Sequence, residues 1–240
     1  MEYIHGINAV RETIRSGNAI RIFVNPRKGT APLVNEAKST GIHVEVVSDE
    51  RLFSLSGTRQ HQGIIAEVKG FSYDSLEELI AKASMKGKIS SLLMLDGIQD
   101  PHNFGAILRS CDAFGVSGII IKSRNQVGVT PTVAKVSTGA INYVPVAMVS
   151  NLTNAVKKLK DSGFWIVGTD GIARDTVDKI DVKRPLCIII GSEGKGISSL
   201  LLSECDYVVK IPMVGHVNSL NASVSAGIIL AMISFLRGEE

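Results

Sequence analysis

Short, almost wholly apolar runs constrain the fold of this 240-residue chain more than any other feature. From Ser91 onward such runs alternate with helical patterns, and the clearest are Leu92–Asp96 and Cys187–Ile190. Continuous apolar strands are typical of a parallel sheet that helices cover on both faces. We therefore predict an α/β fold with a mainly parallel sheet, whose ligands bind at the carboxyl ends of the strands.

A polar loop that runs directly into an apolar segment marks the C-terminal end of the sequence. Val224–Leu236 is apolar on every side of the predicted helix, so we expect this helix to be buried. It is shorter than the roughly 20 residues that a membrane span requires, and we expect no membrane contact. Polar groups stand at the mouth of the helix, as a binding or catalytic site requires, and they are Asn218, Ser219, Asn221 and Ser223.

The chain is predicted to have three parts. Residues 1–70 form a small α/β domain, because helix and strand patterns alternate there over short distances. Residues 71–90 contain one helical pattern and a Lys/Gly/Ser stretch, a composition that suits a linker. Residues 91–240 hold the apolar strands and form the larger domain.

Two polar loops of the small domain are candidates for contact with a nucleic acid. Each follows a predicted strand, and the residues singled out are Arg27, Lys28, Arg59 and His61. Ordinary solvated loops have the same composition. Two such loops in one small domain nevertheless favour a joint grip on a phosphate backbone.

Composition narrows the class of protein without giving its function. A net charge of +3 and a pI of about 8.7 permit a nucleic-acid partner but do not require one. Three scattered cysteines favour a reducing compartment over a disulfide framework. The first residues include charges and no apolar stretch, unlike a signal peptide, so we expect a cytoplasmic protein.

Polar segments follow three of the predicted strands. The first, Gly97–Gly115, has a helix-start signal at Asp100-Pro101 followed by Asn103, which can cap, and by Arg109. Arg109 lies on an otherwise small and apolar helix face, which favours anion binding over a surface salt bridge. The second segment, Gly191–Ser198, fits neither the Walker pattern nor the dinucleotide GxGxxG pattern. We interpret it as a tight glycine turn that exposes main chain to a ligand.

The third segment is the loop before the C-terminal helix. The sequence shows no Ser-His-Asp arrangement, and its five histidines lack the spacing of metal ligands, so we predict no metal. His216 lies beside the serines of this loop, where a polar structural role is favoured over catalysis.

The three segments together resemble an enzyme family. DPHNFGAILRS, IIIGSEGKGI and IPMVGHVNSLNASVSAG look like the three ordered motifs of the SpoU/TrmH family of RNA ribose 2′-O-methyltransferases, in the SPOUT superfamily. The first part resembles the L30e-like substrate-binding domain of this family, through IHGINAVRETI and HQGIIAEV. The combination is most similar to the RlmB type, which methylates a guanosine ribose in large-subunit (23S) rRNA.

The resemblance implies a deep trefoil knot in the larger domain, S-adenosyl-L-methionine as cofactor and a homodimer whose sites are completed across the interface. It implies catalytic roles for five residues, which are Asn103, Arg109, Glu193, Ser219 and Asn221. It also implies that the cofactor is bound largely by main chain at Gly191, Ile211 and Leu220, with the turn that contains Thr169 and Gly171 beside it.

Methyl transfer from a sulfonium to a hydroxyl requires alignment of the two partners and removal of a proton. A guanidinium normally stays protonated, so we favour Arg109 as a phosphate ligand, with the proton leaving through Ser219 or water, over Arg109 as the base. Three other hypotheses remain: an inactive RNA-binding protein of this fold, a tRNA methyltransferase, and a nucleotide-dependent small-molecule enzyme. The failed phosphate-loop patterns disfavour the last of these.

Overall fold

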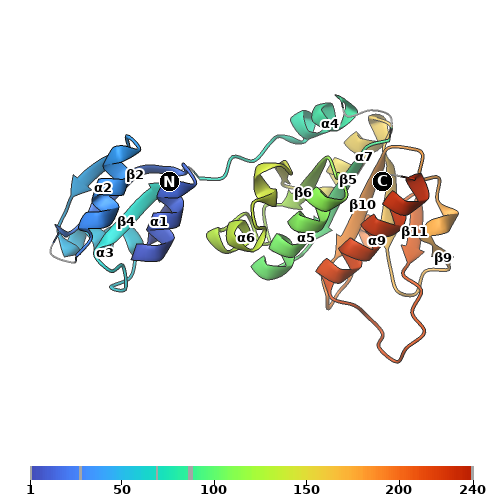
Figure 1. Ribbon diagram of the computed structural model, residues 1–240. Helices are drawn as coiled ribbons and strands as arrows, with labels where there is room; N and C mark the ends of the chain where they lie inside the picture. The colour runs from blue at the N-terminus through green and yellow to red at the C-terminus, as the bar shows by residue number, and fades with distance from the viewer. Residues whose placement is uncertain (1, 27–28, 69, 86–88, 239–240) are drawn as a thin grey trace. The chain divides into compact units, whose positions relative to one another are not determined.

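The computed structural model describes residues 2–26, 29–68, 70–85 and 89–238 (Figure 1). The chain separates into two compact units, residues 1–72 and residues 73–240. Each unit has its own sheet and its own apolar core. Among the helices of the described segments, none is both long and apolar enough to cross a membrane.

The first unit is a four-stranded sheet with helices on both faces. Its strands, in the order β1-β4-β2-β3, are β1 (Glu2–His5), β4 (Ile64–Val68), β2 (Ala19–Val24) and β3 (His43–Val46). Its helices are α1 (Ile7–Arg15), α2 (Ala31–Ser39) and α3 (Asp49–Ser56). Successive strand residues face opposite sides of a sheet. Ile64 accordingly packs with residues of α1 and α2, whereas Ile65 packs with Leu52 of α3.

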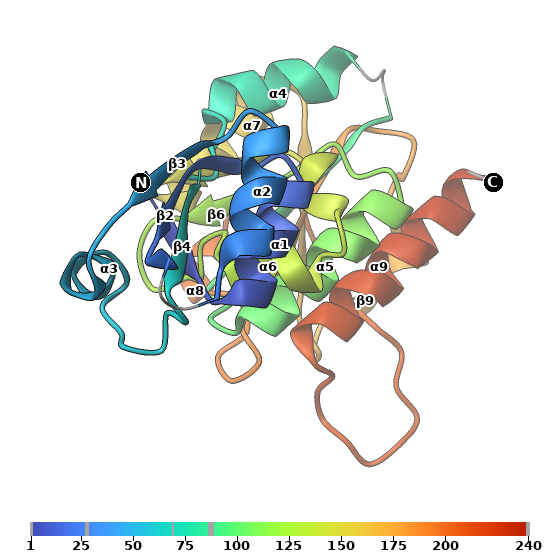
Figure 2. The ribbon, with the colours of Figure 1, turned by 60° about the vertical axis from the view of Figure 1, so that its left-hand side comes forward.

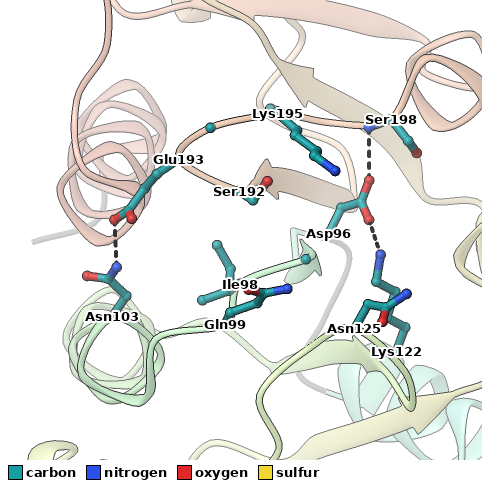
Figure 3. A pocket seen from close by; sticks show the side chains of 13 residues that line it. Asp96, Ile98, Gln99, Asn103, Lys122, Asn125, Ser192, Glu193, Lys195 and Ser198 are labelled. Atoms are coloured by element: carbon teal, nitrogen blue, oxygen red, sulfur yellow. Dashed lines mark hydrogen bonds and ion pairs between the residues drawn. The ribbon is translucent and has the colours of Figure 1, made fainter.

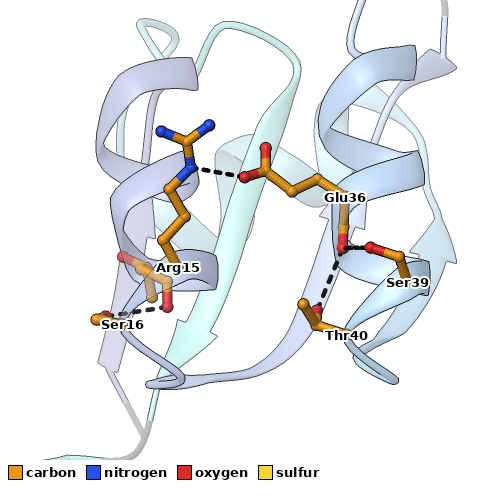
Figure 4. A network of polar contacts seen from close by, with 6 residues as sticks. Arg15, Ser16, Glu36, Ser39 and Thr40 are labelled. Atoms are coloured by element: carbon orange, nitrogen blue, oxygen red, sulfur yellow. Dashed lines mark hydrogen bonds and ion pairs between the residues drawn. The ribbon is translucent and has the colours of Figure 1, made fainter.

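A polar network lies on the surface of the first unit, between α1 and α2 (Figure 4). Arg15 Nε donates to Glu36 Oε1 over 2.7 Å, and the Glu36 carbonyl accepts from the hydroxyls of Ser39 and Thr40. The Arg15 side chain is largely exposed, and exposed ion pairs contribute little to stability. The apolar core therefore stabilises this unit more than the network does.

The second unit is built on a seven-stranded sheet in which all the recorded strand pairs are parallel, as the apolar runs predict. Its order is β7-β6-β5-β10-β8-β11-β9. The strands in chain order are β5 (Ser91–Asp96), β6 (Gly118–Lys122), β7 (Val146–Val149), β8 (Trp165–Thr169), β9 (Asp175–Thr176), β10 (Leu186–Gly191) and β11 (Tyr207–Lys210).

Helices cover both faces of this sheet. One core contains apolar residues of α4 (Leu76–Met85), α7 (Leu152–Asp161) and α8 (Ser199–Leu202) together with residues of the sheet. On the second unit, α5 (Pro101–Ala113) lies beside both α6 (Pro131–Val136) and α9 (Ala222–Arg237), and α9 also contacts β10. Figures 1 and 2 both show α5 and α9 side by side. Two short 3₁₀ helices complete the unit, at Ala140–Asn142 and Val177–Lys179.

The expected linker, residues 71–90, is in large part a structural element of the second unit. Leu76, Leu79 and Ala83 of α4 are buried in its core. The Tyr73 hydroxyl also accepts a hydrogen bond from the Val129 backbone N–H, over 2.7 Å. The expectation of a connector is therefore wrong for residues 73–85, because the apolar face of the helix packs on the sheet. Residues 86–88, in the Lys/Gly/Ser stretch, lie outside the described segments.

The C-terminal helix α9 is less buried than its sequence suggests. Ala226, Ile229 and Ile233 are buried, whereas Phe235 is 83% exposed and Val224 is 47% exposed. The expectation of a helix buried on all sides is wrong for the single chain, because α5 and β10 cover only part of its circumference.

Candidate active site

The strand order of the second sheet has a topological switch point at its centre, between β5 and β10, where the chain builds outward in opposite directions. From β5 the chain adds β6 and β7 on one side, whereas β8, β11 and β9 lie on the other side of β10. The loops after β5 and β10 therefore diverge, and ligands of open parallel sheets bind at such points. Two cavities open at this edge of the sheet, and both are lined by residues that follow strands.

The two cavities share one wall. The β5–β6–β10 cavity has a volume of about 710 Å³ and is lined by residues that follow these three strands. The β8–β10–β11 cavity has a volume of about 310 Å³ and is lined by the loops after its three strands and by the start of α9. Ser192, Glu193, Lys195 and Gly196, in the loop after β10, line both of them.

This shared loop is a tight turn that requires glycine. Ser192 and Gly196 exchange two backbone hydrogen bonds, and Gly196 has a φ of +63°. A Cβ on Gly191 would lie 2.1 Å from the Gly196 carbonyl carbon, so no larger residue fits there without opening the turn. The prediction of a tight glycine turn is confirmed. Its effect is to bring main-chain groups to the surface of both cavities.

Three of the predicted catalytic residues form one hydrogen-bonded network, although they are far apart in the sequence. The Nδ2 atoms of Asn103 and Asn221 each donate to Glu193 Oε1, both over 2.6 Å. Asn221 Nδ2 also donates to Asn103 Oδ1, over 3.0 Å. Figure 3 shows the Asn103 and Glu193 side chains pointing toward each other. The network fixes the orientation of the Glu193 carboxylate.

Helix ends position these amides. Asn221 is the N-cap of α9, where its Oδ1 accepts from the backbone N–H groups of Ser223 and Val224. Asp100 is the N-cap of α5, and its carboxylate accepts from the His102 N–H. The interpretation of Asn103 as a cap is therefore wrong, since its side chain turns toward Glu193 instead.

The five positions expected to bind a cofactor all line the β8–β10–β11 cavity, and they are Thr169, Gly171, Gly191, Ile211 and Leu220. The Thr169 hydroxyl donates to the Ile189 carbonyl over 3.0 Å, so this side chain is held against the sheet. Ser219 also lines the cavity. It is exposed and stands outside the amide network, because it precedes the capped start of α9.

Arg109 is separated from these residues within the chain. Its exposed side chain lines a third cavity, of about 580 Å³, between α5 and the first turn of α9. Ser223 links the two regions, because it lines this α5–α9 cavity and its hydroxyl donates to Asn221 Oδ1 over 2.6 Å. The structure thus places Arg109 beside the network but not on the wall of the β8–β10–β11 cavity.

The candidate RNA-binding residues of the first unit differ in accessibility. Arg27 and Lys28 lie outside the described residues. The Arg59 guanidinium lies 5.3 Å from the centre of the Phe53 ring, at the surface. His61 is only 4% exposed, and its Nδ1 accepts from the Gly63 N–H, so its role as an open surface ligand is not supported. The bond to Gly63 instead places the His61 side chain within the loop before β4.

An ion pair that was not predicted from the sequence lies at the end of the central strands. Lys122 Nζ lies 2.7 Å from Asp96 Oδ1, and the Ser198 N–H donates to Asp96 Oδ2 over 2.9 Å. Burial raises the pKa of Asp96, but the hydrogen bonds from Lys122 and Ser198 outweigh burial and hold it below its ordinary value. A charged residue at the end of each apolar run, in SLLMLD and GIIIK, was the available signal.

Comparison with known proteins assigns the family. The model described as the SpoU rRNA methylase family matches residues 90–231. The chain belongs to the SpoU methylase family. A second family model, described as RNA 2′-O ribose methyltransferase substrate binding, matches residues 3–74. As a SpoU family member the chain is an RNA methyltransferase that uses S-adenosylmethionine.

Individual relatives agree with this assignment. YacO of Bacillus subtilis, named for the TrmH family of tRNA/rRNA methyltransferases, is 44% identical over 233 residues, which cover 95% of this chain and 93% of YacO. The SpoU methyltransferase AviRb from Streptomyces viridochromogenes, solved with AdoMet, aligns with a TM-score of 0.73 and 24% identity over 99% of this chain and 90% of its own. This second likeness supports the fold.

A smaller relative matches only part of the chain. The A. aeolicus TrmH/SpoU tRNA modifying enzyme aligns with a TM-score of 0.58 and 27% identity, over 68% of this chain and 83% of its own.

Among the described residues, no group of three or more His, Cys, Asp or Glu is placed to hold a metal ion.

Proposed function

We propose that this SpoU family member transfers a methyl group from S-adenosylmethionine to a ribose 2′-OH, in a guanosine of 23S rRNA. One observation carries the proposal. Glu193, which the amides of Asn103 and Asn221 hold in place, stands on the wall of the cavity that all five expected cofactor positions line. The substrate-binding family model that matches the first unit, whose description names RNA 2′-O ribose methyltransferases, supports the ribose as acceptor.

The β8–β10–β11 cavity fits S-adenosylmethionine. Its volume of about 310 Å³ is in the range of small-molecule sites. Ile190, Ile197 and Leu220 offer apolar surface for an adenine, while the glycine turn beside them leaves main-chain groups open to hydrogen bonds. Bound S-adenosylmethionine supplies a methyl group already activated by a positive sulfur. The residues of the chain then have to position the acceptor and remove its proton.

In this proposal Glu193 positions the acceptor and does not remove its proton. Its Oε1 already accepts two short hydrogen bonds from Asn103 and Asn221, so the carboxylate is a fixed acceptor rather than a free base. It stands at the border of the two cavities, where it orients the ribose. Ser219 lies on the wall of the smaller cavity with an exposed hydroxyl, and we assign it the passage of the proton to water.

Arg109 binds an RNA phosphate in this proposal, and a second copy of the chain encloses it. A guanidinium stays protonated, which suits phosphate binding and not proton removal. The cavity beside Arg109 is bordered by Val224, and α9 exposes Phe235 and Leu236 as well. Contiguous exposed apolar surface marks interaction sites, and these three exposed side chains all belong to one helix. We therefore propose that α5 and α9 form the homodimer interface that the family resemblance implies.

We also propose that the C-terminal part of the chain forms the trefoil knot of the SPOUT superfamily. The support is that loops after β8, β10 and β11, together with the start of α9, enclose one cavity. Such a threaded path is rare among folds, and the family assignment is its main support.

Two measurements test the proposed function. Calorimetry should show binding of S-adenosylhomocysteine but not of NAD or ATP, and absence of S-adenosylhomocysteine binding would contradict the proposal. Mapping of 2′-O-methyl groups in rRNA and tRNA, from cells with and without the protein, identifies the target. Loss of a methyl group from a 23S guanosine is the expected result. Loss from a tRNA would move the substrate to that class, and no loss would favour an inactive RNA-binding protein.

A further inference from the structure

The β5–β6–β10 cavity has no role in cofactor binding as proposed above. At about 710 Å³ it is larger than the cofactor cavity beside it, and it adjoins the Asn103–Glu193 hydrogen bond. A ribose that Glu193 orients therefore has this space on one side and the cofactor on the other.

Fixed charges form a neutral floor in this cavity. The Asp96 side chain is 8% exposed and bound to both Lys122 and the Ser198 N–H. Its two oxygens are thus occupied, and its charge is compensated by Lys122 (Figure 3). Because Lys122 compensates the charge of Asp96, the pair carries no net charge and attracts neither an anion nor a metal ion strongly. A neutral, polar group is the better occupant.

Three polar side chains at the cavity are available to a ligand. Gln99 and Asn125 bring two amides, and Lys195 brings one ammonium from the opposite side of the cavity (Figure 3). In the described part of the chain, none of these three side chains has a hydrogen bond or ion pair to another residue. An amide offers both donors and an acceptor, as the edge of a nucleobase requires.

We infer that the β5–β6–β10 cavity receives the base of the nucleotide being methylated, turned out of its stack in the RNA. Gln99 and Asn125 bond the edge of this base, and Lys195 holds a flanking phosphate. The inference rests on the proposed function and adds a base-binding site to it. Sequence-specific RNA recognition commonly uses unpaired bases that are splayed out of the stack and read by hydrogen bonds to their edges.

Isosteric variants test the amides in the full-length protein. Gln99→Glu and Asn125→Asp keep shape but replace a donor by a carboxylate, and Asp also tolerates the φ of +54° at position 125. We expect kcat/KM for an RNA containing the mapped target to fall about 10- to 100-fold, the usual range for a lost base contact. Affinity for S-adenosylhomocysteine should not change. Asn154→Asp, on the exposed side of α7, makes the same charge change away from both cavities and should retain full activity.

An abasic target separates base binding from other effects on RNA. A synthetic RNA keeps the target ribose and its 2′-OH but lacks the base. Wild-type protein should methylate this RNA less efficiently, and Gln99→Glu or Asn125→Asp should cause no further loss, because the group that they contact is absent. If each variant reduces kcat/KM equally on both RNAs, the amides do not bind the base and the inference is wrong.

The same data keep this inference distinct from the proposed function. Variants with unchanged kcat/KM on the complete RNA would overturn the base site while leaving methyl transfer intact. A wild-type protein that fails to bind S-adenosylhomocysteine would instead overturn the proposed function. Lys195→Ala is measured separately, because Lys195 also lines the cofactor cavity. A loss of RNA affinity with retained cofactor affinity is expected for it.

Discussion

Glu193 organises the candidate site through contacts that reach two helices. It accepts from Asn103 on α5, from Asn221 at the start of α9 and, more weakly, from the Ala222 N–H over 3.4 Å. One carboxylate thereby joins a residue 90 positions earlier in the chain to one 28 positions later. In the proposed mechanism Glu193 contributes geometry, because a displaced network would misplace the acceptor ribose.

Arg109→Ala tests the proposed binding of an RNA phosphate by Arg109. The side chain is exposed and outside the cofactor cavity, so its removal should leave protein stability and S-adenosylhomocysteine affinity unchanged. Methylation should fall by about 100-fold or more, because loss of a positioning contact has effects of this size. Steady-state methylation of rRNA and calorimetry measure the two effects. Lys157→Ala removes a charge from α7 and serves as control. An active Arg109→Ala protein would exclude Arg109 from the mechanism.

Asp96→Asn tests the ion pair at the floor of the larger cavity. We expect a loss of about 1–3 kcal/mol in the free energy of unfolding, because the substitution leaves Lys122 without its charged partner. The pKa of Asp96 is held below its ordinary value of 3.8. The stabilisation is therefore fully present above pH 3.8 and is lost as the pH falls through the lower pKa of the folded protein. Urea unfolding of both proteins across this range should show the difference shrinking toward acid pH; a constant difference would contradict it.

At the scale of elements, Gly191→Ala tests the turn after β10. The added Cβ would meet the Gly196 main chain at 2.1 Å, so the turn must open. We expect binding of S-adenosylhomocysteine to weaken about tenfold or more, in line with overpacking costs of 1–3 kcal/mol. Gly194→Ala, three residues along the same loop, places its Cβ in open space and is the matched control. Equal cofactor affinity in the two variants would show that the turn does not shape the cavity.

Most long elements could be predicted from the sequence, whereas the relations between them could not. The apolar runs at β5 and β10 predict both strands, because strands covered on two faces need no alternation. The short elements α6 and β9 give too few residues for a period to emerge. The network residues were predicted from motif resemblance. The position of Arg109 in another cavity depends on the packing of α5 against α9, which no local pattern reveals.

At the scale of the whole molecule, removal of residues 1–72 tests the division of labour between the units. Each unit has its own core, so residues 73–240 should fold and bind S-adenosylhomocysteine normally. The KM for RNA should rise, because the first unit matches a substrate-binding family model. Kinetics with the mapped RNA measure this. Unaltered RNA kinetics would refute the assignment of the first unit to substrate binding.

The proposed homodimer is tested through Phe235, which is 83% exposed on α9. Phe235→Glu should convert a dimer to a monomer in sedimentation analysis, because a buried unpaired charge is costly at an apolar interface. Methylation should fall with it if sites are completed between subunits. Met85→Glu changes an equally exposed apolar residue on α4 and should leave the dimer intact. A monomeric wild-type protein would contradict the proposed assembly.

The turn from Ser192 to Gly196 faces two chambers at once, and this has a thermodynamic consequence. Any shift of the turn that strengthens the binding of one ligand therefore also changes the binding of the other. Linkage then requires that the cofactor change the affinity for RNA by the same factor by which RNA changes the affinity for the cofactor. In the proposed reaction, the demethylated cofactor and the methylated ribose lie on opposite sides of this turn after transfer. Release of the two products is therefore expected to be coupled, because the departure of either product changes the affinity of the protein for the other.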